Sequence, residues 1–365
     1  MTRGIALSAL LLGAAAPVAV TAPSPAFEEI RKVDVHSHIF EDVPELAEML
    51  DRTHTRIVNV CVRGTDPERL LRMEAMAEQQ QARYGKARFP FASTFDLTHR
   101  DDPDYVEQVK RWLAASFEKG ALMVKIWKEV GMDIKDRQGR FVLPDDPLFD
   151  PIYAFLAERR KPLLAHIAEP REAWLPLDPQ SVHYGYYSQN PQWHLYGRPG
   201  YPTHDELVAS RDRILERHER LTVIGAHLGS LEYDVDELAR RFDRYPNFFV
   251  DCSARTADLT RQPRDKVRAF LVRYQDRVLY GLDETRSPDP KREDSAEERR
   301  AFVRELEASY RRDFRYYAGE GEMEYRGRTV RGLGLPREVL EKLYHANAER
   351  VIPGLAPEPS TAIAR

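Results

Sequence analysis

Four short hydrophobic segments of the sequence each end on a side chain that can bind a metal ion. These side chains are His36 and His38 in VDVHSH, His166 in LLAH, His227 in IGAH and Asp283 in YGLD. In an extended strand, residues two positions apart point to the same side, so His36 and His38 can converge on one ion. A third imidazole from His166 and the carboxylate of Asp283 would complete the site. Three neutral imidazoles and one carboxylate suit zinc, with manganese or iron as alternatives.

Such a metal with an open coordination position lowers the pKa of bound water toward about 7 and so provides hydroxide at neutral pH. A single HxH pair is weak evidence, because histidines near strand ends are often structural. The combination is more specific: four of the eleven histidines fall at the ends of three strand-like segments, with an aspartate at the end of a fourth. Together these residues predict a catalytic centre.

The elements that position these residues alternate regularly along the chain. The strand-like segments are Lys32–His38, Thr55–Val62, Phe89–Asp96, Ala121–Trp127, Pro162–Ile167, Thr222–His227, Phe248–Ser253 and Val278–Asp283. The helical segments between them include Asp66–Arg83, Asp104–Lys119, Pro147–Arg160, His204–Arg220, Glu232–Arg244 and Arg264–Tyr274. Eight repeats of strand and helix predict an α/β fold, a (β/α)8 TIM barrel whose strands all end at one face.

The first 26 residues differ in composition from the rest. Arg3 precedes an apolar stretch from Ile5 to Val20, which is followed by small residues and prolines. This pattern predicts a secretory signal peptide over residues 1–26 and a single barrel domain over residues 27–365. The apolar stretch is interrupted by Pro17 and is shorter than the roughly 20 residues that span a bilayer, so no stable membrane anchor is expected after processing. We therefore expect an exported protein, periplasmic or extracellular.

Charge and cysteine content narrow the class of partner. The net charge is −4, and basic residues are interspersed with acidic ones, which argues against a nucleic-acid partner. A small-molecule substrate is expected, and a homo-oligomer is compatible with the sequence. Cys61 and Cys252 each lie in a strand-like segment, which favours buried free thiols over a disulfide. No CxxC pair is present, so a thiolate metal site is excluded.

Two connections, residues 168–202 and 284–335, are too long for ordinary barrel loops. Both follow strand ends, where barrel active sites lie, and long connections in compact domains are usually functional. The first is rich in aromatic residues: Trp174, Tyr184, Tyr186, Tyr187, Trp193, His194, Tyr196 and Tyr201. These rings suit a substrate wall, with Trp174 and Trp193 as candidate substrate contacts, or they pack the loop onto the barrel.

The ordered set of motifs resembles the amidohydrolase superfamily, in the amidohydrolase-related branch of metal-dependent hydrolases, hydratases and nonoxidative decarboxylases. The resemblance covers residues 32–353 and rests on VDVHSH, VKIW, LLAHI, VIGAHLGS, VDCSAR, YGLDE and YHANAERVIP. It implies that His36, His38, His166 and Asp283 bind the metal. It also implies that His227 is a general acid/base, a transition-state stabiliser or a fifth ligand. Asp283 would then serve as both ligand and proton acceptor.

Lys125, in the fourth strand-like segment, has two interpretations. Some superfamily members carboxylate a lysine here to bridge two metals, whereas the branch resembled here usually holds one. An unmodified Lys125 would instead face the pocket and neutralise a substrate carboxylate. We favour one metal and an unmodified lysine.

Other polar residues near the strand ends are less well defined. Arg255 is a candidate clamp for a substrate carboxylate or else a surface arginine. Lys128 and Glu129 are expected to be solvated rather than to contact substrate. Leu282 replaces the small hydroxyl residue that often precedes the family's aspartate, and Glu284 adds a carboxylate near the site. Both differences support the role of Asp283 as a metal ligand more strongly than its role as a general base.

Three functional hypotheses follow. The first is a metal-dependent hydrolase that uses metal-activated water on an ester, lactone or amide bond, with His227 stabilising the oxyanion. The second is a nonoxidative decarboxylase of an aromatic or unsaturated carboxylic acid at the same site. The third is a metal-free binding barrel, which has no need for a water-activating set of ligands. Export is unusual for the decarboxylases of the branch and favours hydrolysis.

Overall fold

The computed structural model describes residues 25–62, 67–287 and 292–355. Nearly all of the expected signal peptide, and also Pro288 and Pro290, lie outside these ranges. Within them, no helix combines the length and apolar character needed to cross a membrane.

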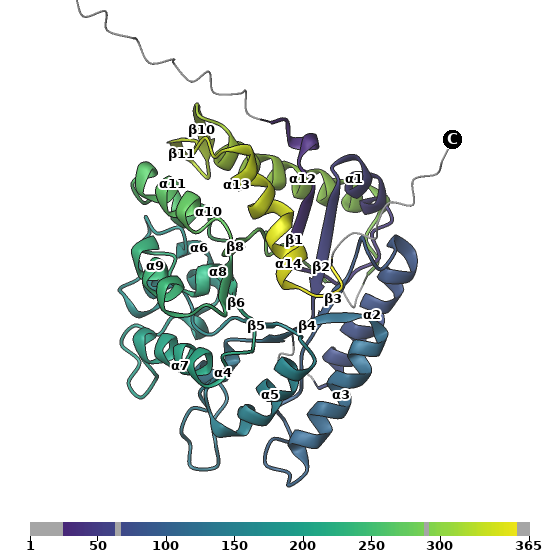
Figure 1. The fold of residues 1–365 in the computed structure, drawn as a ribbon, viewed down its shortest axis with the longest axis vertical. Coiled ribbons are helices and arrows are strands. Elements are labelled where there is room, and N and C mark those ends of the chain that lie inside the picture. The colour runs from purple at the N-terminus through teal and green to yellow at the C-terminus, as the bar shows by residue number, and fades with distance from the viewer. Residues whose placement is uncertain (1–24, 63–66, 288–291, 356–365) are drawn as a thin grey trace, which may run out of the picture.

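A parallel sheet organises the chain, and its strands surround a common centre with the helices outside them (Figure 1). Its order is β8-β7-β6-β5-β4-β3-β2-β1-β9. The strands are β1 Lys32–Ile39, β2 Thr55–Val60, β3 Phe91–Ser93, β4 Ala121–Ile126, β5 Leu163–Ala165, β6 Val223–Gly225, β7 Phe248–Asp251, β8 Val278–Leu279 and β9 Thr285–Arg286. The amides of Val35 and Asp283 donate to the carbonyls of Tyr280 and His36, over 3.0 and 2.6 Å, so β1 lies against the segment after β8. The predicted (β/α)8 barrel is confirmed, with β9 as an addition.

Helices follow the strands as expected. They are α1 Leu46–Arg52, α2 Pro67–Tyr84, α3 Tyr105–Lys119, α4 Glu129–Met132, α5 Asp150–Glu158, α6 Tyr184–Gln189, α7 His204–Arg217, α8 Ala226–Gly229, α9 Val235–Arg244, α10 Thr256–Leu259, α11 Arg264–Arg273, α12 Ala296–Ala318, α13 Arg337–Glu341 and α14 Asn347–Val351. The start of α9 falls later than predicted, because Asp234 caps the helix by accepting from the amide of Asp236. The helix predicted from Asp66 is seen from Pro67, since Asp66 lies outside the described residues.

The barrel interior is apolar up to the level of the candidate site. Met123 on β4 and Leu164 on β5 belong to one buried cluster, which also takes in Val351 of α14. Met123 lies two positions before Lys125, and Leu164 lies two positions before His166. Because side chains two positions apart point to the same face of a strand, each apolar residue shares its face with the polar one that follows. Hydrophobic packing therefore fills the interior and ends where the polar site begins.

Both long connections contain secondary structure. The first holds the short 3-10 helices η3 Arg171–Trp174 and η4 Pro191–Trp193 on either side of α6. The second holds α12, a charged helix that the sequence predicts as far as Tyr317. It also holds an antiparallel hairpin, β10 Glu322–Tyr325 and β11 Arg328–Arg331, and only this hairpin was not predicted. Cys61 and Cys252 are buried and free, as predicted.

Candidate metal centre and active-site pocket

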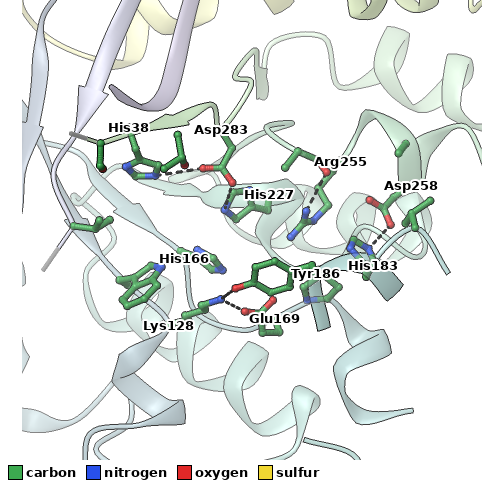
Figure 2. A pocket seen from close by; sticks show the side chains of 18 of the residues that line it. His38, Lys128, His166, Glu169, His183, Tyr186, His227, Arg255, Asp258 and Asp283 are labelled. Carbon is green, nitrogen blue, oxygen red and sulfur yellow. Dashed lines mark hydrogen bonds and ion pairs between the residues drawn. The ribbon is translucent and has the colours of Figure 1, made fainter. Parts of the chain in front are cut away.

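A pocket of about 410 Å³ opens at the carboxyl ends of the strands (Figure 2). Its wall includes His38, His166, His227 and Asp283, which the sequence analysis placed together. Their convergence follows from the fold, because the parallel strands all end at this face. A volume of this size suits a small-molecule ligand.

His36, His38 and Asp283 form a compact cluster of three possible ligands, of which His38 and Asp283 line the pocket. The Oδ1 atom of Asp283 is 3.3 Å from Nε2 of His38 and 3.7 Å from Nε2 of His36. These donor atoms all lie within 4.8 Å of one another. Two imidazoles and one carboxylate so arranged can bind a divalent metal ion.

The hydrogen bonds of His36 and His38 leave Nε2 of each ring available for a metal. Nδ1 of His38 donates to the carbonyl of Val60 over 2.6 Å. Nδ1 of His36 donates to Oδ2 of Asp251 over 3.0 Å. Because a carbonyl and a carboxylate only accept, each Nδ1 carries the proton and each neutral ring presents a lone pair on Nε2. A carboxylate behind a metal-binding histidine is a common arrangement that orients the ring.

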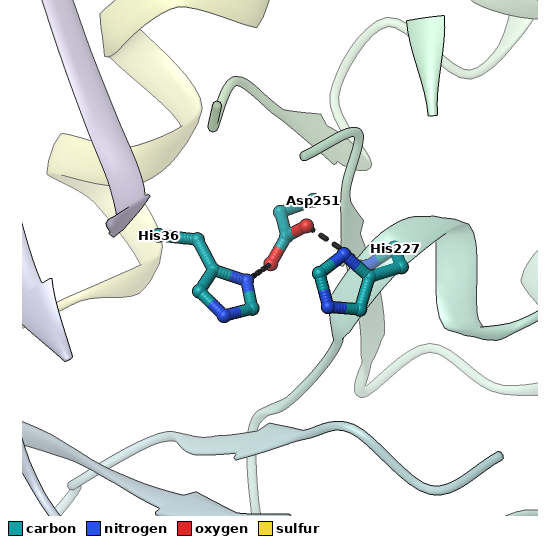
Figure 3. A group of neighbouring side chains, drawn as sticks. All are labelled: His36, His227 and Asp251. Atoms are coloured by element: carbon teal, nitrogen blue, oxygen red, sulfur yellow. Dashed lines mark hydrogen bonds and ion pairs between the residues drawn. The ribbon is translucent and has the colours of Figure 1, made fainter. Parts of the chain in front are cut away.

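Asp251 is a site residue that the sequence analysis missed. It ends β7 and is completely buried. It lies between His36 and His227 (Figure 3), and the amide of His227 donates to its Oδ1 over 2.9 Å. The same oxygen accepts from the hydroxyl of Ser253 over 2.5 Å. Its position at a strand end in the VDCSAR motif was the available signal.

His166 lies on the pocket wall but outside the compact cluster. Its Nε2 is buried with no hydrogen-bond partner among the described residues. Its ring lies edge-to-face with that of His227, with centroids 4.4 Å apart. Burial, and then the positive charge of neighbouring groups, hold the pKa of His166 well below its usual value, so the ring is neutral. An unpartnered neutral imidazole at this position fits a fourth metal ligand.

His227 lies on the opposite side of Asp283, with 3.8 Å between its Nε2 and Oδ2 of the carboxylate. Its Nδ1 donates to the carbonyl of Ser253 over 2.9 Å, so Nε2 has the lone pair in the neutral ring. Burial lowers the pKa of His227 well below its usual value. The neutral ring can therefore accept a proton at Nε2, and it can donate to an oxyanion there only after it has been protonated.

The backbone is strained at the two residues that face each other across the site. His227 has φ +58° and Asp283 has φ +65°. Such left-handed conformations are uncommon for residues other than glycine and cluster at functional sites. Burial raises the pKa of Asp283, but the neighbouring histidines, His227 first, outweigh it and hold the pKa well below its usual value. The carboxylate is thus an anion at neutral pH.

Lys125 is completely buried and donates from Nζ to Nε2 of His36 over 2.9 Å. Burial lowers the pKa of Lys125 to about 8, although Asp251 and Asp283 oppose the shift. The structure thus places Lys125 against a candidate ligand, in the interior of the barrel.

Lys128 and Glu129 were expected to be solvated, and this expectation was wrong. Their exposed fractions are 3% and 4%. Lys128 pairs with Glu169, donates to the hydroxyl of Tyr186 over 2.7 Å, and lies 4.3 Å from the ring centroid of Trp193. The long connection folds over the end of β4 and buries Lys128 and Glu129. Their positions in the sequence did not reveal this burial.

The two candidate tryptophans of the long connection, Trp174 and Trp193, both pack against neighbouring rings. Trp174 donates from Nε1 to the carbonyl of Pro202 over 3.0 Å and packs against His204. Trp193 packs edge-to-face on Trp127. Neither is among the described residues that line the pocket, whereas Tyr186 is.

Arg255 lies on the pocket wall with an exposed fraction of 8%, so it is not a surface arginine. The same wall carries His183 and Asp258, paired through Nε2 and Oδ1 at 2.8 Å. The spacing of His183 in the sequence gave no reason to select it. Glu284 is not among the described residues that line the pocket, and its amide donates to Oγ of Ser37 over 3.2 Å.

Comparison with known proteins identifies relatives. A family model described as amidohydrolase matches residues 33–354. The structure is similar to that of 2,6-dihydroxybenzoate decarboxylase from Rhizobium, with 14% identity, coverage of 88% of this chain and 98% of that chain, and a TM-score of 0.52. The complex of 2,6-dihydroxybenzoate decarboxylase with 2,6-dihydroxybenzoate matches with the same identity and coverage and a TM-score of 0.53. At this identity, the two decarboxylase structures support the fold.

A further match is a probable 2-pyrone-4,6-dicarboxylic acid hydrolase from Acinetobacter baumannii, at 9% identity, 88% and 99% coverage and a TM-score of 0.47. Comparison with curated protein sequences gives no match.

Proposed function

Because this chain belongs to the amidohydrolase family, we propose that it is a metal-dependent hydrolase of an ester, lactone or amide bond in a small molecule. The observation that carries this proposal is the position of the Asp283 carboxylate. One of its oxygens is 3.3 Å from Nε2 of His38, and the other is 3.8 Å from Nε2 of His227. One carboxylate thus lies between a candidate metal ligand and a proton-accepting group.

The residues present fit one divalent metal, and their chemistry favours zinc. His36, His38 and Asp283 supply a compact set of donors, and His166 supplies a buried imidazole nitrogen that lacks a partner among the described residues. Neutral imidazoles with one carboxylate are the ligands zinc prefers, while manganese and iron also accept them. When bound, such a metal acts as a Lewis acid that polarises the substrate carbonyl and acidifies water.

The chain's own residues would handle the protons of hydrolysis. Water attacks the carbonyl carbon, and the Asp283 carboxylate, an anion at neutral pH, accepts the proton that the water loses. His227 lies next to Asp283 with a neutral Nε2. It can take up this proton and donate it to the departing oxygen or nitrogen as the bond to carbon breaks. Water supplies the oxygen that the acyl carbon gains and both hydrogens, one for the new acid group and one for the new hydroxyl or amino group.

Metal content of wild type and of Asp283→Asn tests the site. We expect about one zinc per chain in wild type and much less in the variant, because the amide introduced there is neutral and binds zinc more weakly than a carboxylate. His36→Ala combined with His38→Ala should abolish turnover. Unchanged turnover with undiminished metal content would contradict the assignment.

The runner-up is a nonoxidative decarboxylase, which Arg255 on the pocket wall also suits, since a guanidinium can hold a carboxylate substrate. The two reactions can be separated with isotopes once a panel of esters, lactones, amides and hydroxybenzoates has given a substrate. Hydrolysis in H₂¹⁸O places ¹⁸O in the product acid. Decarboxylation in D₂O places deuterium on the carbon that loses CO₂ and releases no labelled acid.

A further inference from the structure

The pocket wall carries a second polar cluster, distinct from the metal-ligand cluster. It consists of His183, Asp258 and Arg255, whose exposed fractions are 8%, 7% and 8%. In Figure 2, Arg255 lies between the Asp283–His227 pair and the His183–Asp258 pair. One pocket therefore has polar groups in two places.

The His183–Asp258 pair is rigidly held. Asp258 Oδ1 accepts from His183 Nε2 over 2.8 Å, and the amide of His183 donates to Oγ of Ser181 over 2.9 Å. His183 directly precedes α6 in the long connection, whereas Asp258 lies on α10 beyond β7. The pair thus fastens the connection to the barrel and presents an imidazole edge to the pocket.

Arg255 has hydrogen-bonding capacity left for a ligand. Within the described residues, its one hydrogen bond runs from a terminal nitrogen to the carbonyl of Ala254 over 3.0 Å, and its buried Nε has no partner. A guanidinium offers five N–H donors in a planar fork that matches a carboxylate. Lys128, another cation of the pocket wall, already pairs with Glu169.

The charges of the pocket wall favour an anion. Among the described residues, four basic side chains line the wall, namely Arg69, Lys128, Arg255 and Arg326, against the three carboxylates Glu169, Asp258 and Asp283. Asp258 faces His183, and Asp283 faces the candidate ligand His38. The guanidinium of Arg255 is therefore not neutralised by direct pairing with either.

We infer that Arg255 and His183 form a second subsite, which binds a carboxylate at the end of the substrate that does not react. This inference rests on the proposed function: the reacting carbonyl lies at Asp283 and His227, while the remote carboxylate accepts hydrogen bonds from Arg255 and contacts the His183 ring. Asp258 is a positioning residue, because it fixes that ring. The substrate class is a small carboxylic acid with its ester, lactone or amide bond several atoms away from the acid group.

The subsite is tested by comparing the binding of dicarboxylates with the binding of monocarboxylates. Linear dicarboxylates from succinate to pimelate are titrated calorimetrically into the purified protein, beside monocarboxylates of the same carbon number. We expect at least one dicarboxylate to bind about tenfold more tightly than its matched monocarboxylate, with an optimum in chain length. His183→Gln and Arg255→Lys should each reduce this ratio severalfold. The matched control is His194→Gln, because His194 lies in the same connection, is not among the described residues lining the pocket, and contacts the carbonyl of Leu175.

Equal binding of both probe types to wild type would overturn the subsite, and so would an unchanged ratio in both variants. Metal content and hydrolytic turnover are measured on the same samples. A preparation that holds metal and hydrolyses an ester without preferring dicarboxylates overturns the subsite alone. One that prefers dicarboxylates but hydrolyses nothing in the panel overturns the hydrolase assignment alone.

Discussion

The hydroxyl of Tyr310 donates to Oδ2 of Asp34 over 2.8 Å and joins helix α12 to the strand that carries His36 and His38. Asp34 also accepts from the amides of His36 and Leu282, over 3.0 and 3.1 Å. One buried carboxyl therefore fixes the backbone next to His36 on β1 and next to Asp283 in the segment between β8 and β9, and Tyr310 supports it from the connection after β8.

Tyr310→Phe should weaken both the fold and the metal site. The variant keeps the ring but leaves a fully buried carboxyl without one of its donors, which costs roughly 1–3 kcal/mol of unfolding free energy. Urea unfolding and a metal titration measure the two effects. Tyr196→Phe is the control, because 54% of Tyr196 is exposed. Equal losses in both variants would show that the bond to Asp34 has no special role.

Asp251→Asn should reduce metal affinity about 10–100-fold, as is typical when the carboxylate behind a metal-binding histidine is removed. The reason is that the new amide would still reach Nδ1 of His36 but would carry no charge to raise the basicity of Nε2. Competition with a chromophoric chelator measures the affinity. Asp243→Asn, at an exposed ion pair with Arg273, should bind metal as wild type does. Wild-type affinity in Asp251→Asn would refute the orienting role.

Lys125→Met distinguishes one metal from two. In a mononuclear site, Nζ of Lys125 competes for the lone pair on Nε2 of His36, so its removal should leave the stoichiometry at one and strengthen binding severalfold. If Lys125 were instead carboxylated and bridged two ions, the variant would bind more weakly and lose one of them. Elemental analysis measures the number of metal ions per chain, and the same chelator competition measures the affinity.

Glu232→Gln should change the pH dependence of stability. Burial, and then the charge of Asp258, raise the pKa of Glu232 to about 7 from its ordinary value of 4.5. The folded state therefore binds this proton more tightly than the unfolded state. The resulting stability is present below pH 4.5 and lost as the pH rises through 7, and it amounts to about 3 kcal/mol because the two pKa values differ by about 2.5.

Urea unfolding at pH 5 and pH 7.5 measures this loss, which should disappear in Glu232→Gln because an amide does not titrate. Glu219→Gln, at an exposed position, should retain the wild-type profile. Parallel profiles for wild type and Glu232→Gln would rule out the shift.

Local sequence patterns predicted the barrel and the clustering of His36, His38 and Asp283 because both depend on short-range order. His36 and His38 share one face of β1 because they are two positions apart, and Asp283 lies near them because parallel strands end at one face, whatever the loops do. The hairpin was missed, although Arg326 and Gly327 have positive φ angles and form the kind of tight turn that joins alternating strands. The signal present in the sequence itself was Gly327, between the segments that form β10 and β11.

The polar pairs of the long connection could not be predicted in this way. His183 and Asp258 are 75 positions apart, and Lys128 and Glu169 are 41 apart. Their meeting depends on how the connection packs over the strand ends, which no periodicity encodes. The same packing decides that Tyr186 reaches the pocket while Trp174 does not.

The left-handed backbone at His227 and Asp283 limits which residues can replace them during evolution. β-Branched residues are poorly tolerated in this conformation, whereas asparagine and glycine adopt it readily. A descendant of this chain could therefore exchange either residue for asparagine, lose the reaction and still fold. Barrels of this lineage that have become binding proteins would then be recognisable by asparagine or glycine at these two positions.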